Sequence, residues 1–270
     1  ETTSNVHNPN FFPAIDQLIA PLDATDFKAL QPELLLTFGG MVVSKKIKKF
    51  LRDYPPKVHY HIDTKKAFDT YFCLTSHVRC TPNYFFKELL PLKNKPVSTY
   101  QQDWLGIKHL RLQKHELYLK EIPFSDFLVF SQLFKSLPSN IQLQLGNSST
   151  IRYGQLFEMN PSHTIFCNRG TSGIDGSTST AIGAAYAGIS PTVFITGDLS
   201  FFYDSNALWN QHIARDFKII IINNSGGGIF RILPDAKQVF SFDTFFETKH
   251  QLTASQLSDM YGFDYQSAND

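Results

Sequence analysis

The chain has 270 residues, of which 42% are hydrophobic and 18% charged, a composition typical of a globular protein with material for one large or two medium domains. Its formal net charge of +1 excludes a broad nucleic-acid-binding surface, which needs a strong basic excess. The sequence contains no signal peptide and no long apolar run, so we expect no integral membrane segment. The three cysteines (Cys73, Cys80 and Cys167) are too few and too irregularly spaced for a disulfide framework or a zinc site, and we expect reduced thiols in a cytoplasmic protein.

The first part of the chain predicts a parallel β-α-β unit. A short apolar run at 34–40 predicts a strand, the basic segment 44–54 a helix, and residues 58–62 a second strand. Residues 85–92 predict a further helix. The polar, proline-bearing stretch 93–98 predicts a loop.

A second α/β stretch begins near Ile122. Strands are predicted at 141–145, 163–167, 192–196 and 217–222, and helices at 127–137, 176–188, 205–214 and 252–261. The last strand contains four consecutive isoleucines, and such fully apolar strands belong in sheets that are covered on both faces. We therefore predict an α/β fold of doubly wound parallel sheets between two layers of helices.

Two short polar segments each follow a predicted strand. They are Gly197-Asp198-Leu199-Ser200 and Asn223-Asn224-Ser225-Gly226-Gly227. Successive parallel strands can lie side by side, and ligands collect beyond their carboxyl ends, so Asp198 and Asn224 are expected to share one small space. A carboxylate, an amide oxygen and a backbone carbonyl suit a hard divalent cation that also holds a diphosphate. Each segment alone is more often a simple turn or helix cap, and the pairing is what favours the metal site.

These segments resemble the motif of thiamine-diphosphate enzymes, which is usually Gly-Asp-Gly followed later by Asn-Asn. Leu199 stands where the motif usually has glycine, and this departure fits one branch, the 2-succinyl-5-enolpyruvyl-6-hydroxy-3-cyclohexene-1-carboxylate synthases of menaquinone biosynthesis. Further segments resemble this branch: 146–148 with Arg152, 168–176, 197–208 and 223–234. Before residue 145 the resemblance is thin and depends mainly on Ser44-Lys45-Lys46.

The resemblance implies a domain organisation. Residues 1–120 would form a central, Rossmann-like domain that is incomplete at its start, and residues 121–270 a diphosphate-binding domain that is truncated at its C-terminus. An amino-terminal pyrimidine-binding domain, which carries the family's catalytic glutamate, would be absent, so we expect this chain alone to be inactive. Both domains would be doubly wound parallel-sheet domains of the thiamine-diphosphate enzyme type, with three αβα layers.

The resemblance also implies the cofactor site. Asp198, Asn224 and the carbonyl of Gly226 would bind Mg²⁺ or Mn²⁺, and Ser172, Leu199, Ser200 and Ile229 would contact thiamine diphosphate. Ile174 would wedge between the two rings of the cofactor and is a candidate catalytic residue. Ser172 and Ser200 could equally cap helices, and Ile174 could be an ordinary core residue.

The implied reaction is the decarboxylation of 2-oxoglutarate and the addition of the four-carbon unit to isochorismate. Arg152 and Arg169 are candidate catalytic and carboxylate-binding residues. The other candidate substrate-binding residues are Asn147, Ser148, Lys45, Lys46, Ile229, Phe230 and Leu233. Lys45 and Lys46 could instead belong to a solvated helix face, and Ile229, Phe230 and Leu233 to one side of a short packed helix.

Two other functions stay open on the sequence alone. One is another thiamine-diphosphate enzyme, such as a 2-oxoacid decarboxylase or an acetohydroxyacid synthase. The other is a non-catalytic nucleotide-binding α/β module, although no Gly-x-Gly-x-x-Gly follows a strand and no phosphate-loop lysine motif is present. Because thiamine enzymes of this type build sites between subunits, the resemblance implies a homodimer or homotetramer.

Overall fold

The structure is a computed structural model that describes residues 1–92, 97–170, 172–232 and 240–269. The chain divides into two compact units, one formed by Glu1 and Asn8–Tyr118 and the other by Thr2–His7 and Leu119–Asp270. Each unit is built on a parallel sheet with helices, so the α/β prediction is confirmed. Among the described residues, no helix combines the length and apolar character needed to cross a membrane.

The first unit contains a parallel sheet with the strand order β1-β2-β3. The strands are β1 (Leu34–Phe38), β2 (Val58–Ile62) and β3 (Ser76–Val78). The β-α-β unit predicted from the sequence is present, with α3 (Lys45–Asp53) between β1 and β2. β3 was not predicted, because it is only three residues long and lacks an apolar run.

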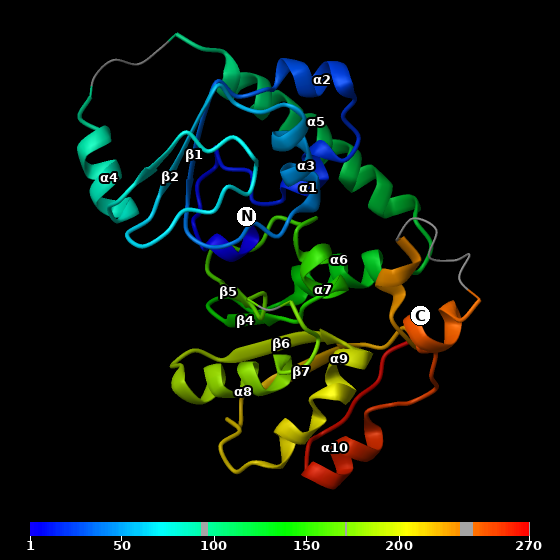
Figure 1. Ribbon diagram of the computed structural model, residues 1–270. Coiled ribbons are helices and arrows are strands. Elements are labelled where there is room, and N and C mark those ends of the chain that lie inside the picture. Colours follow the sequence, from blue (N-terminus) through cyan, green and yellow to red (C-terminus); the bar gives the residue numbers. More distant parts are fainter. Residues whose placement is uncertain (93–96, 171, 233–239, 270) are drawn as a thin grey trace. The chain divides into compact units, whose positions relative to one another are not determined.

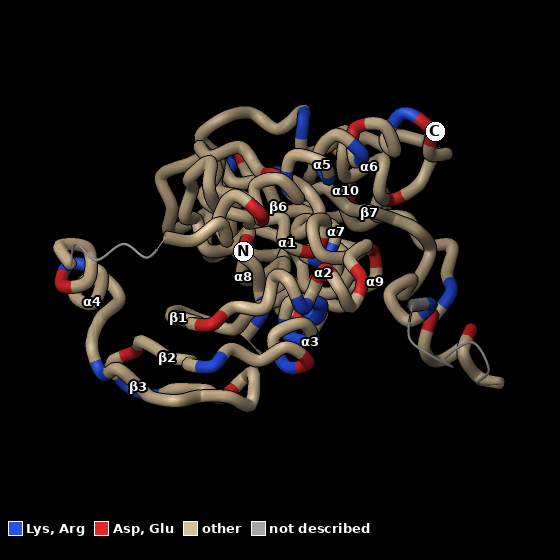
Figure 2. The backbone as a smooth tube through the Cα atoms, turned by 90° about the horizontal axis from the view of Figure 1, so that it is seen from above, with Lys and Arg blue, Asp and Glu red and all other residues tan. Residues whose placement is uncertain are grey.

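The remaining helices of the first unit are α1 (Ile15–Ile19), α2 (Ala24–Ala29), α4 (Pro82–Leu89) and α5 (Tyr100–Glu121). The Ser44 hydroxyl caps α3 by accepting a hydrogen bond from the Ile47 amide at 3.0 Å. Phe50, Leu51 and Trp104 belong to the unit's apolar core. Figure 2 shows Lys and Arg gathered along α3, whose sequence is KKIKKFLRD.

α5 is the longest helix in the described part of the chain, and it was not predicted from the sequence. Its first residues belong to the first unit, and those from Leu119 onward are assigned to the second. Trp104 is its only buried residue, and its apolar residues do not gather on one face. Without such a stripe there is no helical periodicity to recognise.

The second unit contains a parallel sheet with the strand order β5-β4-β6-β7. Its strands are β4 (Gln142–Leu145), β5 (Thr164–Cys167), β6 (Thr192–Gly197) and β7 (Lys218–Ile222), all near their predicted positions. β6 and β7 are neighbours, with Gly197 opposite Ile222. The segments that follow these two strands therefore leave the sheet at the same edge.

Helices cover both faces of this sheet. In Figure 1, α6 (Asp126–Ser136) and α7 (Ser149–Gly154) lie on one side, and α8 (Ser177–Ala187), α9 (Asp198–Tyr203) and α10 (Ser255–Tyr261) lie on the other. The core between α8, α9 and the sheet includes Ala181, Ile182, Phe194 and Phe201. The second unit therefore has the predicted layered arrangement.

One helix prediction in this unit was wrong. The sequence pattern predicted a helix at 205–214, but the structure has α9 directly after β6 and then a short 3₁₀ helix, Ser205–Trp209. The Asn210 side chain donates to the Ala207 carbonyl at 2.6 Å and accepts from the His212 amide at 2.8 Å. These local side-chain bonds compete with helix hydrogen bonds and end the helix early.

Candidate functional site

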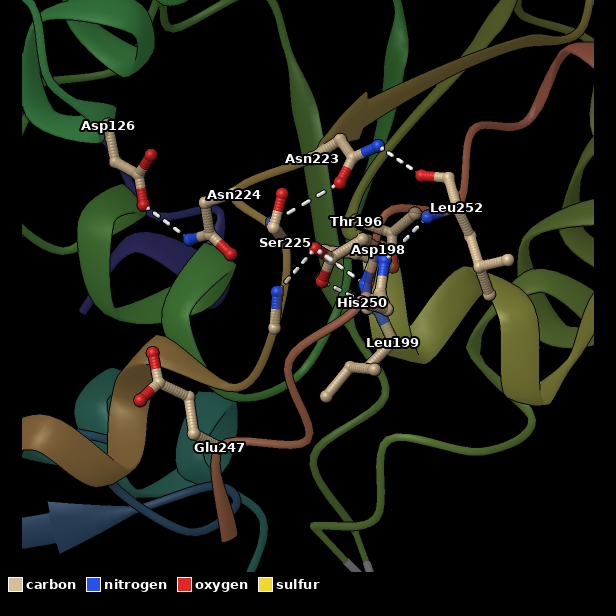
Figure 3. A network of polar contacts seen from close by, with 12 residues as sticks. Asp126, Thr196, Asp198, Leu199, Asn223, Asn224, Ser225, Glu247, His250 and Leu252 are labelled. Atoms are coloured by element: carbon tan, nitrogen blue, oxygen red, sulfur yellow. Dashed lines mark hydrogen bonds and ion pairs between the residues drawn. The ribbon is translucent and has the colours of Figure 1, made fainter. Parts of the chain in front are cut away.

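Asp198 lies at the carboxyl end of β6 and connects the loops that follow β6 and β7. Its side chain is buried, with the residue 2% exposed. One carboxylate oxygen accepts from the Leu199 amide at 2.7 Å, and the other accepts from the Gly226 amide at 3.0 Å (Figure 3). The structure thus brings the two predicted motif segments together through this one carboxylate.

Asn224 follows β7 and is half-buried. Its side-chain nitrogen Nδ2 donates to Oδ2 of Asp126 at 2.7 Å. Figure 3 shows the amide nitrogen pointing to Asp126 and the amide oxygen pointing away from it, toward the side on which Asp198 lies. Asn224 therefore makes its contact through nitrogen and leaves its oxygen for another partner.

Gly226 is held in a conformation that favours glycine. Its φ is +150°, and an added Cβ would lie 2.7 Å from the Glu247 carbonyl oxygen. Its amide faces Asp198, whereas its carbonyl accepts from the Gly228 amide at 3.0 Å. The structure thus presents the Gly226 amide, rather than the predicted carbonyl, to Asp198, and the carbonyl's role as a metal ligand stays a prediction.

Ser200 connects α9 to the loop that carries Ile174. The Ser200 hydroxyl is buried and donates to the Ile174 carbonyl. Leu199 and Ile174 are both half-buried. Ser200 lies inside α9 and does not act as a cap, because the residue at the start of this helix is Gly197.

A second polar cluster surrounds Asn147 at the end of β4. Asn147 is 4% exposed, accepts from Nη1 of Arg169 at 2.7 Å, and donates to the carbonyls of Ser172 and Gly173. The Ser172 hydroxyl donates to the Arg169 carbonyl at 3.3 Å, so this residue does not cap a helix either. The structure therefore brings three predicted site residues, Asn147, Arg169 and Ser172, into one network.

Close backbone packing holds this cluster beside β6. A Cβ on Gly146 would lie 2.9 Å from Oγ1 of Thr196, so only glycine allows the approach.

Cys167 ends β5, and burial raises the pKa of its thiol to about 11, although Arg169 opposes the shift. Because the thiol is therefore protonated at neutral pH, Cys167 is not suited to nucleophilic catalysis.

The other predicted residues lie in several elements. Ser148 precedes α7, with φ of +71°, and Arg152 is half-buried within α7. Ile229 and Phe230 are half-buried in the 3₁₀ helix Gly228–Ile232, where the Phe230 ring packs edge-on against Phe246 at 6.0 Å.

Two predicted substrate-binding residues belong to the first unit, and a third is not described by the structure. Lys45 and Lys46 are exposed in the first turn of α3, in the first unit. Leu233 lies outside the described residues.

The segment Glu247–His250, which was not predicted to belong to the site, contacts the Asn224–Gly227 loop. The Glu247 carbonyl accepts from the Gly227 amide at 2.6 Å, and the His250 amide donates to the Ser225 carbonyl at 3.3 Å. The His250 side chain places Nε2 3.2 Å from Oδ2 of Asp198, outside hydrogen-bond alignment, while Nδ1 accepts from the Leu252 amide. No local motif marks this segment, because its role depends on tertiary contact alone.

The donor set fits a cation that shares its coordination with phosphate oxygens. Among the described residues, no group of three or more His, Cys, Asp or Glu side chains could hold a metal ion. Mg²⁺ does not need such a group, because it is usually held by one or two carboxylates together with phosphate oxygens. The buried Asp198 and the free-facing oxygen of Asn224 match this requirement.

Comparison with known proteins finds similarity in the region that contains these residues. Residues 146–268 match the family described as "Thiamine pyrophosphate enzyme, C-terminal TPP binding domain", thiamine pyrophosphate being another name for thiamine diphosphate. The whole chain is 57% identical to the 2-succinyl-5-enolpyruvyl-6-hydroxy-3-cyclohexene-1-carboxylate synthase of Flavobacterium johnsoniae and covers 49% of that protein. The synthase of Flavobacterium psychrophilum is 56% identical over 100% of this chain, which covers 49% of that protein. The synthase of Christiangramia forsetii is 54% identical over 100% of this chain, which covers 48% of that protein. The chain spans about half the length of these relatives. Residues 146–268 are therefore similar to the C-terminal TPP-binding domain of thiamine pyrophosphate enzymes, and the whole chain is similar to the matching half of the 2-succinyl-5-enolpyruvyl-6-hydroxy-3-cyclohexene-1-carboxylate synthases.

Proposed function

We propose that this protein takes part in the decarboxylation of 2-oxoglutarate and the addition of the resulting four-carbon unit to isochorismate, in menaquinone biosynthesis. The observation that carries the proposal is the similarity of the entire chain to proteins named for the product of this reaction. In this proposal the protein is a transferase that depends on thiamine diphosphate and on Mg²⁺ or Mn²⁺.

In this proposal the carboxyl ends of β6 and β7 hold the metal and the diphosphate. Asp198 would supply the charged ligand and Asn224 a neutral oxygen ligand, and both follow neighbouring strands. Gly226 would contribute its carbonyl after a local change of its hydrogen bonding. Thiamine diphosphate, when bound, supplies the reactive carbon at which a 2-oxoacid can be decarboxylated. Leu199, Ser172, Ser200 and Ile174 would contact and orient this cofactor.

The substrates carry carboxylates, and the proposal assigns these to arginine. Arg169 is already fixed by Asn147, and a guanidinium that is held in one orientation can bind a carboxylate with little loss of conformational entropy. Arg152 would bind the distal carboxylate of the 2-oxoglutarate-derived unit, and Asn147 and Ser148 would shape that end of the site. Ile229 and Phe230 would form an apolar wall that excludes water, and Leu233, Lys45 and Lys46 stay candidate substrate-binding residues.

The proposal extends to the whole protein. We propose a cytoplasmic homo-oligomer, a dimer or tetramer, that is completed by an amino-terminal pyrimidine-binding domain. Residues 1–120 would be its central domain and residues 121–270 its diphosphate-binding domain. Light scattering on the full-length protein tests the oligomer, and a monomer with full activity would contradict it.

Turnover of the full-length protein tests the activity. With thiamine diphosphate and Mg²⁺, we expect 2-oxoglutarate to be consumed much faster when isochorismate is present, with the adduct detected by mass spectrometry. Equal consumption without isochorismate, or a preference for pyruvate, would instead identify another 2-oxoacid decarboxylase or an acetohydroxyacid synthase. Calorimetry distinguishes any thiamine-diphosphate enzyme from a nucleotide-binding module, because the first should bind thiamine diphosphate and the second a dinucleotide.

A further inference from the structure

Asp126 is the first residue of α6 and lies far in sequence from the two motif segments, yet it contacts one of the proposed metal ligands. Its Oδ2 accepts from Nδ2 of Asn224 at 2.7 Å. We infer that Asp126 is a positioning residue that orients the Asn224 amide so that its oxygen faces the metal. This inference rests on the proposed function, because it assumes that Asn224 binds the metal.

The two ends of the asparagine amide interact differently with a cation. The oxygen is an acceptor that can bind a cation, whereas the NH₂ group is a donor that repels one. Rotation by 180° about the last side-chain bond exchanges the two ends with almost no change in shape. An asparagine that serves as a metal ligand therefore benefits from a partner that selects one orientation.

An ionised carboxylate is such a partner, because it can accept hydrogen bonds but cannot donate them. Beside Asp126, only the orientation with NH₂ toward the carboxylate is favourable. The opposite orientation would place two oxygens in contact and lose a charge-assisted hydrogen bond. Figure 3 shows the consequence, with the Asn224 nitrogen toward Asp126 and the oxygen pointing away from it.

The position of Asp126 in the fold holds its carboxylate in place. It lies in the first turn of α6, where the helix dipole stabilises negative charge. α6 is anchored by Phe130, which is 1% exposed and stacks on Tyr153 at 4.7 Å. Phe127 packs on Phe157 at 5.0 Å on the same helix. This packing fixes the helix end against α7, so the carboxylate does not have to be ordered when the metal binds.

Metal binding to the full-length protein tests the inference without measuring turnover. Mn²⁺ is titrated in the presence of thiamine diphosphate and followed by electron paramagnetic resonance. In Asp126→Asn the new side chain can either accept or donate, so it no longer selects one orientation of Asn224. We expect Mn²⁺ affinity to fall by roughly 10- to 100-fold, the usual effect of losing an outer-shell partner of a metal ligand. Asp216→Asn, at an exposed position of the same unit, removes the same charge and should leave the affinity unchanged.

A second substitution separates orientation from a merely structural role. A carboxylate at position 224 presents oxygen in either rotation, so it needs no orienting partner. In the Asp126→Asn background, Asn224→Asp should therefore restore most of the lost Mn²⁺ affinity, with the new amide at position 126 donating to the second oxygen. If Asp126 only stabilised α6, the added substitution would not restore metal binding.

The outcomes are distinct. Parent-like Mn²⁺ affinity in Asp126→Asn, or no recovery in the double variant, overturns the inference and leaves the proposed function intact, provided that Asn224→Ala weakens binding. Absence of Mn²⁺ and cofactor binding in the parent protein overturns the proposed function, and this inference with it.

Discussion

At the scale of single residues, Asp198 has two roles that a substitution can separate. It connects the β6 and β7 loops through two backbone amides, and it is the only charged metal ligand proposed. Asp198→Ala in the full-length protein should weaken Mg²⁺-dependent binding of thiamine diphosphate by more than the roughly 10- to 100-fold typical of an outer-shell residue. Calorimetry measures this, and unchanged cofactor binding would contradict the assignment.

The same substitution should also lower stability. The Gly226 amide, which bonds Asp198 in a buried position, would lose its partner, and an unsatisfied buried donor costs about 1–3 kcal/mol. Asp198→Asn keeps an acceptor oxygen in place and should recover part of this stability while metal binding stays weak. Thermal unfolding without metal separates the two effects.

Arg152 gives a second prediction at this scale. A carboxylate that leaves water for a site walled by apolar residues needs a charged, hydrogen-bonded partner. Arg152→Ala in the full-length protein should raise the KM for 2-oxoglutarate by about 30-fold or more, corresponding to about 2 kcal/mol, the low end for truncating a buried charge pair. Cofactor affinity should not change. Arg152→Lys keeps the charge without the planar fork and should be intermediate. Parent-like kinetics in Arg152→Ala would remove Arg152 from the site.

At the scale of elements, the segment Glu247–His250 fixes the loop after β7. Gly226→Ala would force the new methyl group against the Glu247 carbonyl, at 2.7 Å, in a backbone conformation that residues other than glycine rarely adopt. We expect the unfolding free energy to fall by about 1–3 kcal/mol. Gly183→Ala is the matched control, because an added Cβ there meets no atom within 4 Å and alanine favours its helix, α8. Equal thermal midpoints for the two variants would show that the loop is not constrained.

Strand β2 gives a prediction about pH. His59 and His61 are buried in it, and the Thr37 hydroxyl lies between them, 2.8 Å from Nε2 of His59 and 2.9 Å from Nδ1 of His61. Burial lowers the pKa of both histidines. Asp69 opposes the shift for His59 and Asp63 for His61, while His77 adds to the shift for His61.

Because the folded pKa lies below the ordinary value of about 6.5, the unfolded chain takes up protons first as the pH falls. The two histidines therefore make their full contribution to the free energy of unfolding above about pH 6.5, and this contribution decreases as the pH falls below that value. The thermal midpoint should fall between pH 7.5 and 5, and less steeply in His59→Gln/His61→Gln. The exposed His212→Gln should keep the parent slope. An unchanged slope in the double variant would contradict this origin.

At the scale of the whole molecule, the chain aligns with about half of each of its relatives. In the function proposed above, the family's catalytic glutamate would be supplied by the other half. Purified residues 1–270 should therefore show no measurable carboligation and only weak binding of thiamine diphosphate, because half of the cofactor cleft would be absent. Circular dichroism establishes that this chain is folded, and the full-length protein is the positive control. Turnover by the chain alone would show that its site is complete.

The sequence by itself determined most of the sheet framework and the chemistry of the motif. Short apolar runs such as Ile219–Ile222 identify buried strands, and polar segments directly after them mark the edge where ligands bind. Each of these signals lies within a few consecutive residues, so a single sequence is enough to identify it. The helix at 205–214 was wrong and α5 was not predicted, because side-chain hydrogen bonds ended the first and the second lacks an apolar face.

Only the tertiary structure decided which groups the motif residues contact. It pairs Asn224 with Asp126, sets His250 beside Asp198, and joins Arg169 to Ser172 through Asn147. It also turns the Gly226 amide, rather than its carbonyl, toward Asp198. These contacts join residues far apart in the chain, and hydrogen-bond direction depends on how the backbone and side chains are packed. The spacing of residues in the sequence indicates neither these long-range contacts nor the direction of the hydrogen bonds. The contact of Asp126 with Asn224 could therefore be found only from the fold.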